Sequence, residues 1–139
     1  MALERTLALI KPHAVKVGHA GEILSRIQQA GFRIVAIKTL RLSKADVEGF
    51  YAVHKGQSFF DEMTTHMSSG KVFAIVLEGE NAIARWREVM GPTDPAQAAP
   101  GTLRRDFGVN IRLNATHGSD SRENAALEIS YFFTSAELS

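Results

Sequence analysis

The stretch Asn114-Ala115-Thr116-His117-Gly118-Ser119-Asp120 stands near the end of the chain and leads into a segment with helical character. Apolar residues recur there at helical spacing, as Ala125, Ile129 and Phe132. Either Ser119 or Asp120 suits the N-cap position, and Glu123 follows Asp120 as in a capping box. We therefore expect His117 just ahead of a helix N-terminus, where free N–H groups and the helix dipole attract anions such as phosphate.

The chemistry available to His117 is nucleophilic. A neutral imidazole, whose unperturbed pKa is about 6.5, attacks through one ring nitrogen when the other is held as an N–H. Glu128 lies two turns into the expected helix and is the acceptor that we expect for this N–H. Gly118 should leave space for a bulky group. A histidine in this position is more often a cap or a packed side chain, so the residue alone does not decide the function.

Composition restricts the classes of protein that remain. A chain of 139 residues, 45% of them hydrophobic, can bury one core, so we expect a single domain over 1–139. The net charge of +1 argues against bulk nucleic-acid binding through a broad basic face. The absence of cysteine excludes disulfides and thiolate metal sites. Residues 1–5 lack the features of a signal peptide and the apolar run 72–77 is too short to span a membrane, so we expect a cytoplasmic protein.

Strand and helix patterns alternate along the chain. The expected strands are residues 6–10, 32–42 and 71–78, with a short one within 111–117. The expected helices are residues 20–30, 43–53, 58–67 and 82–89, with a last one after residue 120. This order predicts an α+β, ferredoxin-like fold: a four-stranded antiparallel sheet of βαββαβ order with an inserted helical pair, helices on one face, and a C-terminal helix.

Several polar residues lie where ligand groups commonly lie. Lys11 lies at the end of the first strand. It is either a ligand for an anion or a sugar hydroxyl, or simply the charged residue that ends the strand. Arg87, Thr93 and Arg104 flank or lie within an irregular stretch over about 90–102, and their donors would suit phosphate oxygens. A charged surface loop is the ordinary alternative. Large aromatic residues at helical spacing, such as Phe59, are usually core.

The stretch 114–120 closely resembles the active-site signature of nucleoside diphosphate kinases, which reads Asn, two variable residues, His, Gly, Ser, Asp. The chain also resembles this family at Lys11-Pro12, at Gly91-Pro92-Thr93 and over 100–104, and the resemblance covers nearly its whole length, in the bacterial type with a short C-terminus. It implies that His117 takes the γ-phosphate of a nucleoside triphosphate as a pros-phosphohistidine. A nucleoside diphosphate then accepts it, in ping-pong fashion.

The resemblance also implies roles for other residues. These are the ribose ligands Lys11 and Asn114, the phosphate ligands Arg87, Thr93 and Arg104, the base-covering Phe59 and Ile111, and the supporting Tyr51, His54 and Ser119. Mg²⁺ should arrive with the nucleotide, because no carboxylate cluster offers a dedicated site, and Asp120 could reach it through water. Similar proteins form tetramers or hexamers from a dimer that pairs through strand 32–42.

The sequence departs from the family pattern at four positions. His13 replaces the acidic residue that usually follows the proline, Gln57-Ser58 replace the usual Arg-Pro or Lys-Pro, and Arg105 stands where a small residue is usual. Two other functions compete. A histidine phosphocarrier or relay module would leave the predicted nucleotide ligands unexplained. An RRM-type nucleic-acid binder needs exposed aromatics on its inner strands, and strand 72–77 has only Phe73.

Overall fold

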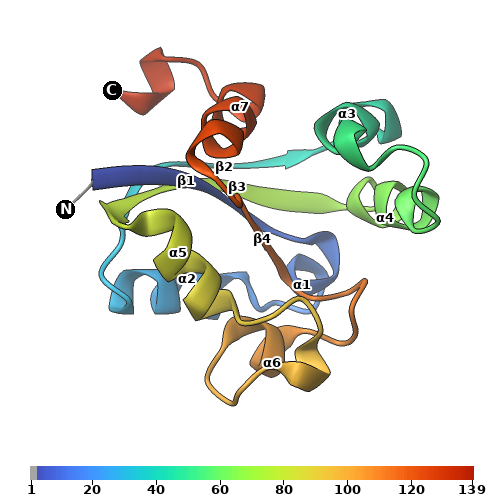
Figure 1. Ribbon diagram of the computed structural model, residues 1–139, viewed down its shortest axis with the longest axis horizontal. Coiled ribbons are helices and arrows are strands. Elements are labelled where there is room, and N and C mark those ends of the chain that lie inside the picture. Colours follow the sequence, from blue (N-terminus) through green and yellow to red (C-terminus); the bar gives the residue numbers. More distant parts are fainter. Residues whose placement is uncertain (1–2) are drawn as a thin grey trace.

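The computed structural model describes residues 3–139, and a four-stranded antiparallel sheet forms its centre (Figure 1). The strands are β1 (Leu3–Ile10), β2 (Arg33–Arg41), β3 (Lys71–Glu80) and β4 (Thr116–Gly118). Their order is β2-β3-β1-β4, with β1 paired to β3 and β4, and β2 paired to β3. This order confirms the ferredoxin-like prediction. Met1 and Ala2, part of the segment examined for a signal peptide, lie outside the described residues.

Ten helical segments connect or follow the strands in the described part of the chain. They are α1 (Pro12–Lys16), α2 (Ala20–Gln29), α3 (Lys44–Phe50), η1 (Ala52–His54), α4 (Phe60–Met67), α5 (Ala82–Met90), η2 (Pro95–Gln97), α6 (Leu103–Phe107), α7 (Arg122–Phe132) and η3 (Ala136–Leu138). None of those within residues 3–139 is long and apolar enough to cross a bilayer. The short helices α1 and α6 were not predicted. Pro12 ends β1, as expected, but its fixed φ also suits the first turn of a helix.

Helices cover both faces of the sheet, so the prediction of helices on one face is wrong. In Figure 1, α2 and α5 lie on one side of the sheet, and α7 with α3 lies on the other. The residues of β1 alternate between two buried clusters, with Ala8 and Ile10 in one and Leu7 and Leu9 in the other. A strand buried on both faces has apolar residues at successive positions, because neither face meets water.

The junction between β4 and α7 differs from the prediction. Ser121, rather than Ser119 or Asp120, caps α7, and its Oγ accepts from the Asn124 N–H at 3.1 Å. The side chain of Asp120 instead accepts from Asn124 Nδ2 at 2.6 Å. His117 belongs to β4 and pairs with Leu9 of β1, so a strand rather than a helix N-terminus holds the histidine.

The α3–α4 hairpin begins as the sequence predicts. Ser43 and Asp46 form a capping box, in which each side chain accepts from the other residue's backbone N–H. The helix ends at Phe50, three residues earlier than expected, and the one-turn η1 follows it. At the edge of the sheet opposite β4, strand β2 pairs, among the described strands, only with β3 and carries a bulge between Ile34 and Ala36.

Candidate active site

His117 lies on β4, and a residue of α7 holds its ring. Nε2 of His117 is 2.8 Å from Glu128 Oε1, and Ser119 Oγ donates to the same oxygen at 2.8 Å. The fully buried Ser119 also accepts from the Leu7 N–H at 3.3 Å, which ties this group to β1. Because a carboxylate accepts, Nε2 carries the hydrogen and Nδ1 keeps its lone pair.

Two aromatic rings enclose the imidazole. The ring centroids of Phe50 and Tyr51 lie 5.4 and 5.9 Å from that of His117, both in edge-on geometry. Burial lowers the pKa of His117, and the Glu128 carboxylate opposes this shift. Burial also raises the pKa of Tyr51, which therefore stays a phenol. The histidine is neutral near pH 7, the state in which Nδ1 is nucleophilic.

Gly118 serves packing, so the expectation that it leaves space for a bulky group is wrong. A Cβ at this position would lie 2.5 Å from Trp86 Cδ1 and 2.6 Å from Met90 Cε. The same tryptophan donates from Nε1 to the carbonyl oxygen of His117 at 3.1 Å. The glycine thus lets α5 lie close against β4, and the contact fixes the backbone that carries the histidine.

Lys11 and Asn114, the predicted ribose ligands, are joined by a hydrogen bond. Lys11 Nζ donates to Asn114 Oδ1 at 2.7 Å, and Asn114 Nδ2 donates to the Thr93 carbonyl at 3.1 Å. Burial, with the charges of Arg104 and Arg112, lowers the pKa of Lys11 to about 7. This lysine therefore changes its charge within the physiological pH range.

Arg104 comes from α6 and is held by two backbone carbonyls. Nη1 donates to Gly91 and Nη2 to Thr116, both at 3.0 Å. The side chain is 8% exposed, and its buried Nε has no hydrogen-bond partner among residues 3–139. Burial and the charge of Arg87 lower the pKa of Arg104 to about 10, so it remains a cation at neutral pH. Each terminal nitrogen keeps a second N–H for a ligand.

The predicted phosphate ligands share one surface hollow. Arg87, Thr93 and Arg104 line a hollow of about 690 Å³ between the end of α5 and the loop that follows. Arg87 is exposed and also lines an adjoining hollow together with Asp120. The structure therefore brings together two cations and a hydroxyl that lie within or beside the irregular stretch after α5.

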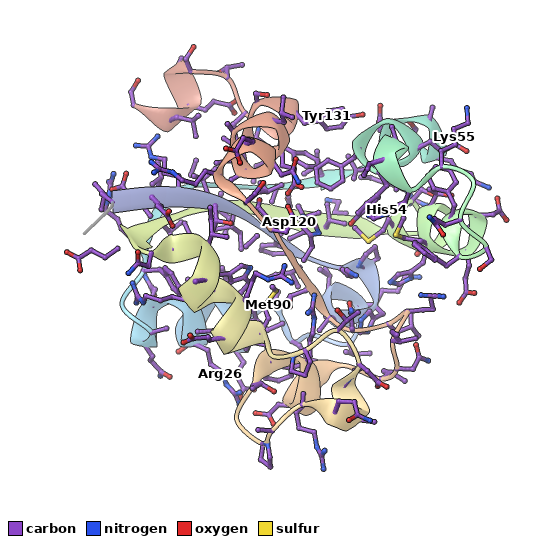
Figure 2. The ribbon with its side chains drawn as sticks, in the orientation of Figure 1. Arg26, His54, Lys55, Met90, Asp120 and Tyr131 are labelled. Carbon is purple, nitrogen blue, oxygen red and sulfur yellow. The ribbon has the colours of Figure 1, made fainter. Side chains whose placement is uncertain are left out.

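The predicted base-binding residues Phe59 and Ile111 do not line this hollow. His54, on the connection between α3 and α4 (Figure 2), lies 5.7 Å from Phe59 and 6.2 Å from Tyr51 by ring centroids. Ile111 is 47% exposed. The group that lies over the Phe59 ring is the guanidinium of Arg112, 4.9 Å from its centroid.

Asp120 lines a hollow that adjoins the one of the predicted phosphate ligands and shares Arg87 with it. It lies at the start of the segment that leads into α7, in the middle of the view in Figure 2. The hydrogen bond from Asn124, and further the charges of Arg87 and His117, lower its pKa, so it is ionised at neutral pH. No group of three or more His, Cys, Asp or Glu residues that could hold a metal occurs within residues 3–139. One exposed carboxylate fits a cation that brings its own oxygen ligands.

The positions that depart from the family pattern have defined surroundings. His13 Nε2 accepts from the Ala115 N–H at 2.9 Å. Arg105 Nη1 donates to the Ala98 carbonyl at 3.3 Å, so this side chain binds the backbone of the irregular stretch before α6. Gln57 and Ser58 are exposed in the turn before α4.

Sequence reasoning missed Arg112 and Trp86 as neighbours of the site. Arg112 follows Asn110, whose Oδ1 accepts from the N–H groups of Arg112 and Leu113, and an Asn in such a loop is a recognisable turn signal. No signal in the sequence indicates that this turn aims the guanidinium at Phe59. Trp86 is fully buried, and its Nε1–H reaches the His117 carbonyl because α5 packs against β4, a contact that the sequence does not reveal.

Comparisons with known proteins agree with this geometry. A family model for nucleoside diphosphate kinase matches residues 4–138. The nucleoside diphosphate kinase of Chlamydia abortus is 55% identical over 136 residues, which are 98% of this chain and 96% of that protein. Nucleoside diphosphate kinase 2 of Protochlamydia amoebophila is 56% identical over 138 residues, 99% of this chain and 96% of that protein.

Solved structures of this kind superpose closely on the whole chain. The Aquifex aeolicus nucleoside diphosphate kinase has a TM-score of 0.97 and 46% identity, covering 99% of this chain and 100% of that one. A halophilic nucleoside diphosphate kinase from Halobacterium salinarum, in complex with CDP, has a TM-score of 0.94 and 38% identity, covering 99% and 92%. The chain belongs to the nucleoside diphosphate kinase family.

Proposed function

We propose that His117 carries the phosphate in the reaction of this family, the reversible transfer of a γ-phosphate between nucleoside triphosphates and diphosphates. The observation that carries the proposal is the Nε2 contact with Glu128, because it leaves the lone pair on Nδ1. The product would be a pros-phosphohistidine. Such a reaction maintains the pools of ribo- and deoxyribonucleoside triphosphates.

The proposed transfer has two half-reactions. In the first, the Nδ1 lone pair forms a bond to the γ-phosphorus, the bond to the β–γ bridging oxygen breaks, and the diphosphate leaves with that electron pair. The ring becomes cationic as the bond forms, and the Glu128 carboxylate stabilises the Nε2–H that carries this charge. In the second half-reaction a different diphosphate attacks the phosphohistidine, and the imidazole returns to its neutral form.

The remaining residues would bind the nucleotide. Arg87, Arg104 and Thr93 would meet phosphate oxygens, since they line one hollow and two of them are cations. The Lys11–Asn114 pair would meet the ribose hydroxyls. Phe59 would stack on the base, and Ile111 would cover the base beside it. The Arg112 guanidinium, which now lies over the Phe59 ring, would either move away from the ring or stay above it. The CDP bound to the Halobacterium salinarum relative supports a nucleotide site.

A divalent cation takes part in the reaction of this family, and we propose Mg²⁺, bound with the nucleotide. Asp120 would contact it through water, because one exposed carboxylate cannot supply six oxygen ligands. Bound in this way, the cation would neutralise charge on the phosphates. The residues of this chain would position Nδ1 of His117 and bind the phosphate oxygens.

Assembly and location follow from the same proposal. We expect a homotetramer or homohexamer built from dimers, because β2 forms an edge of the sheet and exposes Ile37 to 44%. Because its substrates belong to the nucleotide pools, the cytoplasm is the location that we propose. We also retain one domain over residues 1–139.

The alternative of a histidine phosphocarrier or relay module has one observation in its favour, the pairing of an imidazole with a carboxylate. It leaves the part-buried Lys11–Asn114 pair and the cationic hollow without a ligand. A titration with ADP distinguishes the two functions, because a relay module would show no saturable binding.

The experiment that tests the proposed function uses γ-labelled ATP. The wild-type protein should take up label that is acid-labile and base-stable, as a phosphoramidate is, and adding any nucleoside diphosphate should remove it. His117→Ala should take up none. Acid-stable label, or label that persists in His117→Ala, would contradict the proposal. Steady-state kinetics should be ping-pong.

A further inference from the structure

The backbone just ahead of the histidine makes a rare turn. Ala115 has a φ of 76°, and the Thr116 N–H donates to the Asn114 carbonyl at 2.9 Å. An i to i+2 hydrogen bond around a residue with this φ is a γ-turn of the strained kind. Ala115 is fully buried and has a Cβ, so the surrounding structure must hold it in this conformation.

Residues of the β1–α1 junction hold this turn from both sides. The Lys11 N–H donates to the Ala115 carbonyl at 2.8 Å, and the Ala115 N–H donates to Nε2 of His13 at 2.9 Å. Both backbone polar groups of Ala115 are therefore satisfied by two residues that lie two positions apart, Lys11 and His13. The backbone part of this clamp is independent of sequence, whereas the other part needs a side-chain acceptor at position 13.

The turn places groups that the proposed reaction uses. The Asn114 side chain bridges Lys11 and Thr93, and the Thr116 carbonyl accepts from Arg104. His117 follows directly, in register with Leu9. A change at Ala115 would therefore move the ribose-facing amide and the anchor of a phosphate-facing guanidinium together.

We infer that His13 is a positioning residue, whose neutral imidazole holds the Ala115 turn and thereby aligns Asn114 for the ribose 3′-hydroxyl. The inference rests on the proposed function. Nε2 must be unprotonated to accept, so the hydrogen sits on Nδ1. An acidic residue, which is usual at this position, also offers an acceptor, but a carboxylate and an imidazole are protonated at different pH values.

The environment of His13 favours the neutral form. Burial, with the nearby charges of His66, Lys11 and His19, lowers the pKa of His13 to about 4. The His66 ring of α4 lies 5.4 Å away, and its own pKa is lowered by burial and by Lys11 and Lys16. Glu62 of α4 opposes the shift of His66. Protonation of His13 in acid would replace the acceptor with a donor that faces another donor.

Two variants separate the acceptor from the volume of the side chain. In His13→Gln, Oε1 can take the place of Nε2 and does not titrate, whereas His13→Met has a similar length and no such acceptor. With GTP as donor and ADP as acceptor near neutral pH, His13→Met should lower kcat/KM by about tenfold to a hundredfold, since a buried N–H loses its partner. His13→Gln should restore most of it.

Selectivity for the 3′-hydroxyl gives a readout that folding alone would not change. The ratio of kcat/KM for ADP to that for 3′-deoxy-ADP should fall in His13→Met and stay near the wild-type value in His13→Gln. If both variants equal the wild type in rate and selectivity, or if both lose only thermal stability, the inference is wrong. Failure of the proposed function is a separate result, because wild-type protein would then not transfer phosphate through His117.

The pH profile tests the inference even if His13→Met does not fold. The wild type and His13→Gln share every other titrating group, so the ratio of their kcat/KM values isolates residue 13. The ratio of wild type to His13→Gln should be constant near neutral pH and should fall as the pH drops through about 4, the pKa of His13. A ratio that is unchanged at about pH 3.5, where most of the His13 imidazole would be protonated, would overturn the role of the neutral imidazole.

Discussion

The hydrogen bond between His117 and Glu128 determines which ring nitrogen can react. The carboxylate does more than orient the ring, because its charge lies 2.8 Å from the Nε2–H that becomes acidic as Nδ1 gains phosphorus. Ser119 donates to the same oxygen and fixes its direction. Three side chains within one short segment therefore set both the tautomer and the direction of attack.

Glu128→Gln should lower kcat by about tenfold to a hundredfold, since the amide oxygen still accepts but carries no charge. Ser119→Ala removes the bond that aligns the carboxylate and the acceptor for the Leu7 N–H, but it keeps the charge of Glu128, so its effect on kcat should be smaller. Single-turnover phosphorylation by ATP, followed by rapid acid-free quenching, measures the chemical step directly. An unchanged rate in Glu128→Gln would show that orientation alone matters.

Lys11 links nucleotide binding to proton uptake. Its pKa of about 7 in the free protein means that it is largely neutral at about pH 8, and a bound phosphate favours the charged ammonium. ADP binding should therefore take up close to one proton at about pH 8, and affinity should weaken as the pH rises above 7. Calorimetry in buffers of different ionisation enthalpy measures the uptake.

Lys11→Arg is the matched control for this prediction. A guanidinium stays charged throughout this range, so the variant should lose the uptake that Lys11 contributes while the protonation of ADP itself remains in both titrations. Equal proton counts in the two proteins would show that Lys11 is already charged before the nucleotide binds.

At the scale of elements, the contact of β4 with α5 depends on Gly118. A methyl group there would overlap the Trp86 indole, which is buried and cannot rotate away, and the more flexible end of Met90. Gly118→Ala should lower the free energy of unfolding by about 1–3 kcal/mol. Thermal and denaturant unfolding measure this loss.

Gly21→Ala supplies the control for the contact at Gly118. A Cβ at Gly21 meets no atom within 4 Å, and the residue lies in α2. Alanine favours a helix over glycine by about 1 kcal/mol, so this variant should be neutral or more stable than the wild type. If both alanines had the same effect, the close approach of α5 to β4 would not be what Gly118 provides.

The sequence predicts elements well where the signal is local. A helix over 43–53 was expected, and the capping box of Ser43 and Asp46 that starts it lies within three residues of sequence. The prediction fails for α1, α6 and the bounds of β4. The two helices have only five residues each, too few to show a helical period, whereas β4 has three residues that pair with the distant β1. Leu7 to Ile10, an unbroken apolar run, also indicates burial on both faces, a signal that the one-face prediction overlooked.

The candidate site divides in the same way. His117 on β4 and Glu128 in α7 lie eleven positions apart on consecutive elements, so their short separation in the sequence was enough to pair them. The contact of His13 with Ala115 spans most of the chain, and the Arg112 guanidinium reaches Phe59 from a separate loop. Such pairs depend on which strands are neighbours, and periodicity carries no information about that.

At the scale of the whole molecule, the β2 edge is the surface through which we expect copies to associate. Ile37 is 44% exposed on this strand, and a charge there would have to be buried in a pairing of two such edges. Ile37→Lys should therefore reduce the mass measured by sedimentation, whereas Ile37→Val should not. An unchanged mass in the lysine variant would exclude pairing through this face of β2.

The strand order has a consequence for biosynthesis. As the chain leaves the ribosome, β1, β2 and β3 are available early, but the outer edge of β1 is paired only by residues 116–118. Until those residues emerge, the edge of β1 stays open and the His117 imidazole is absent. A nascent chain thus completes its sheet and acquires the proposed nucleophile in the same late event, shortly before α7 brings Glu128 to the histidine.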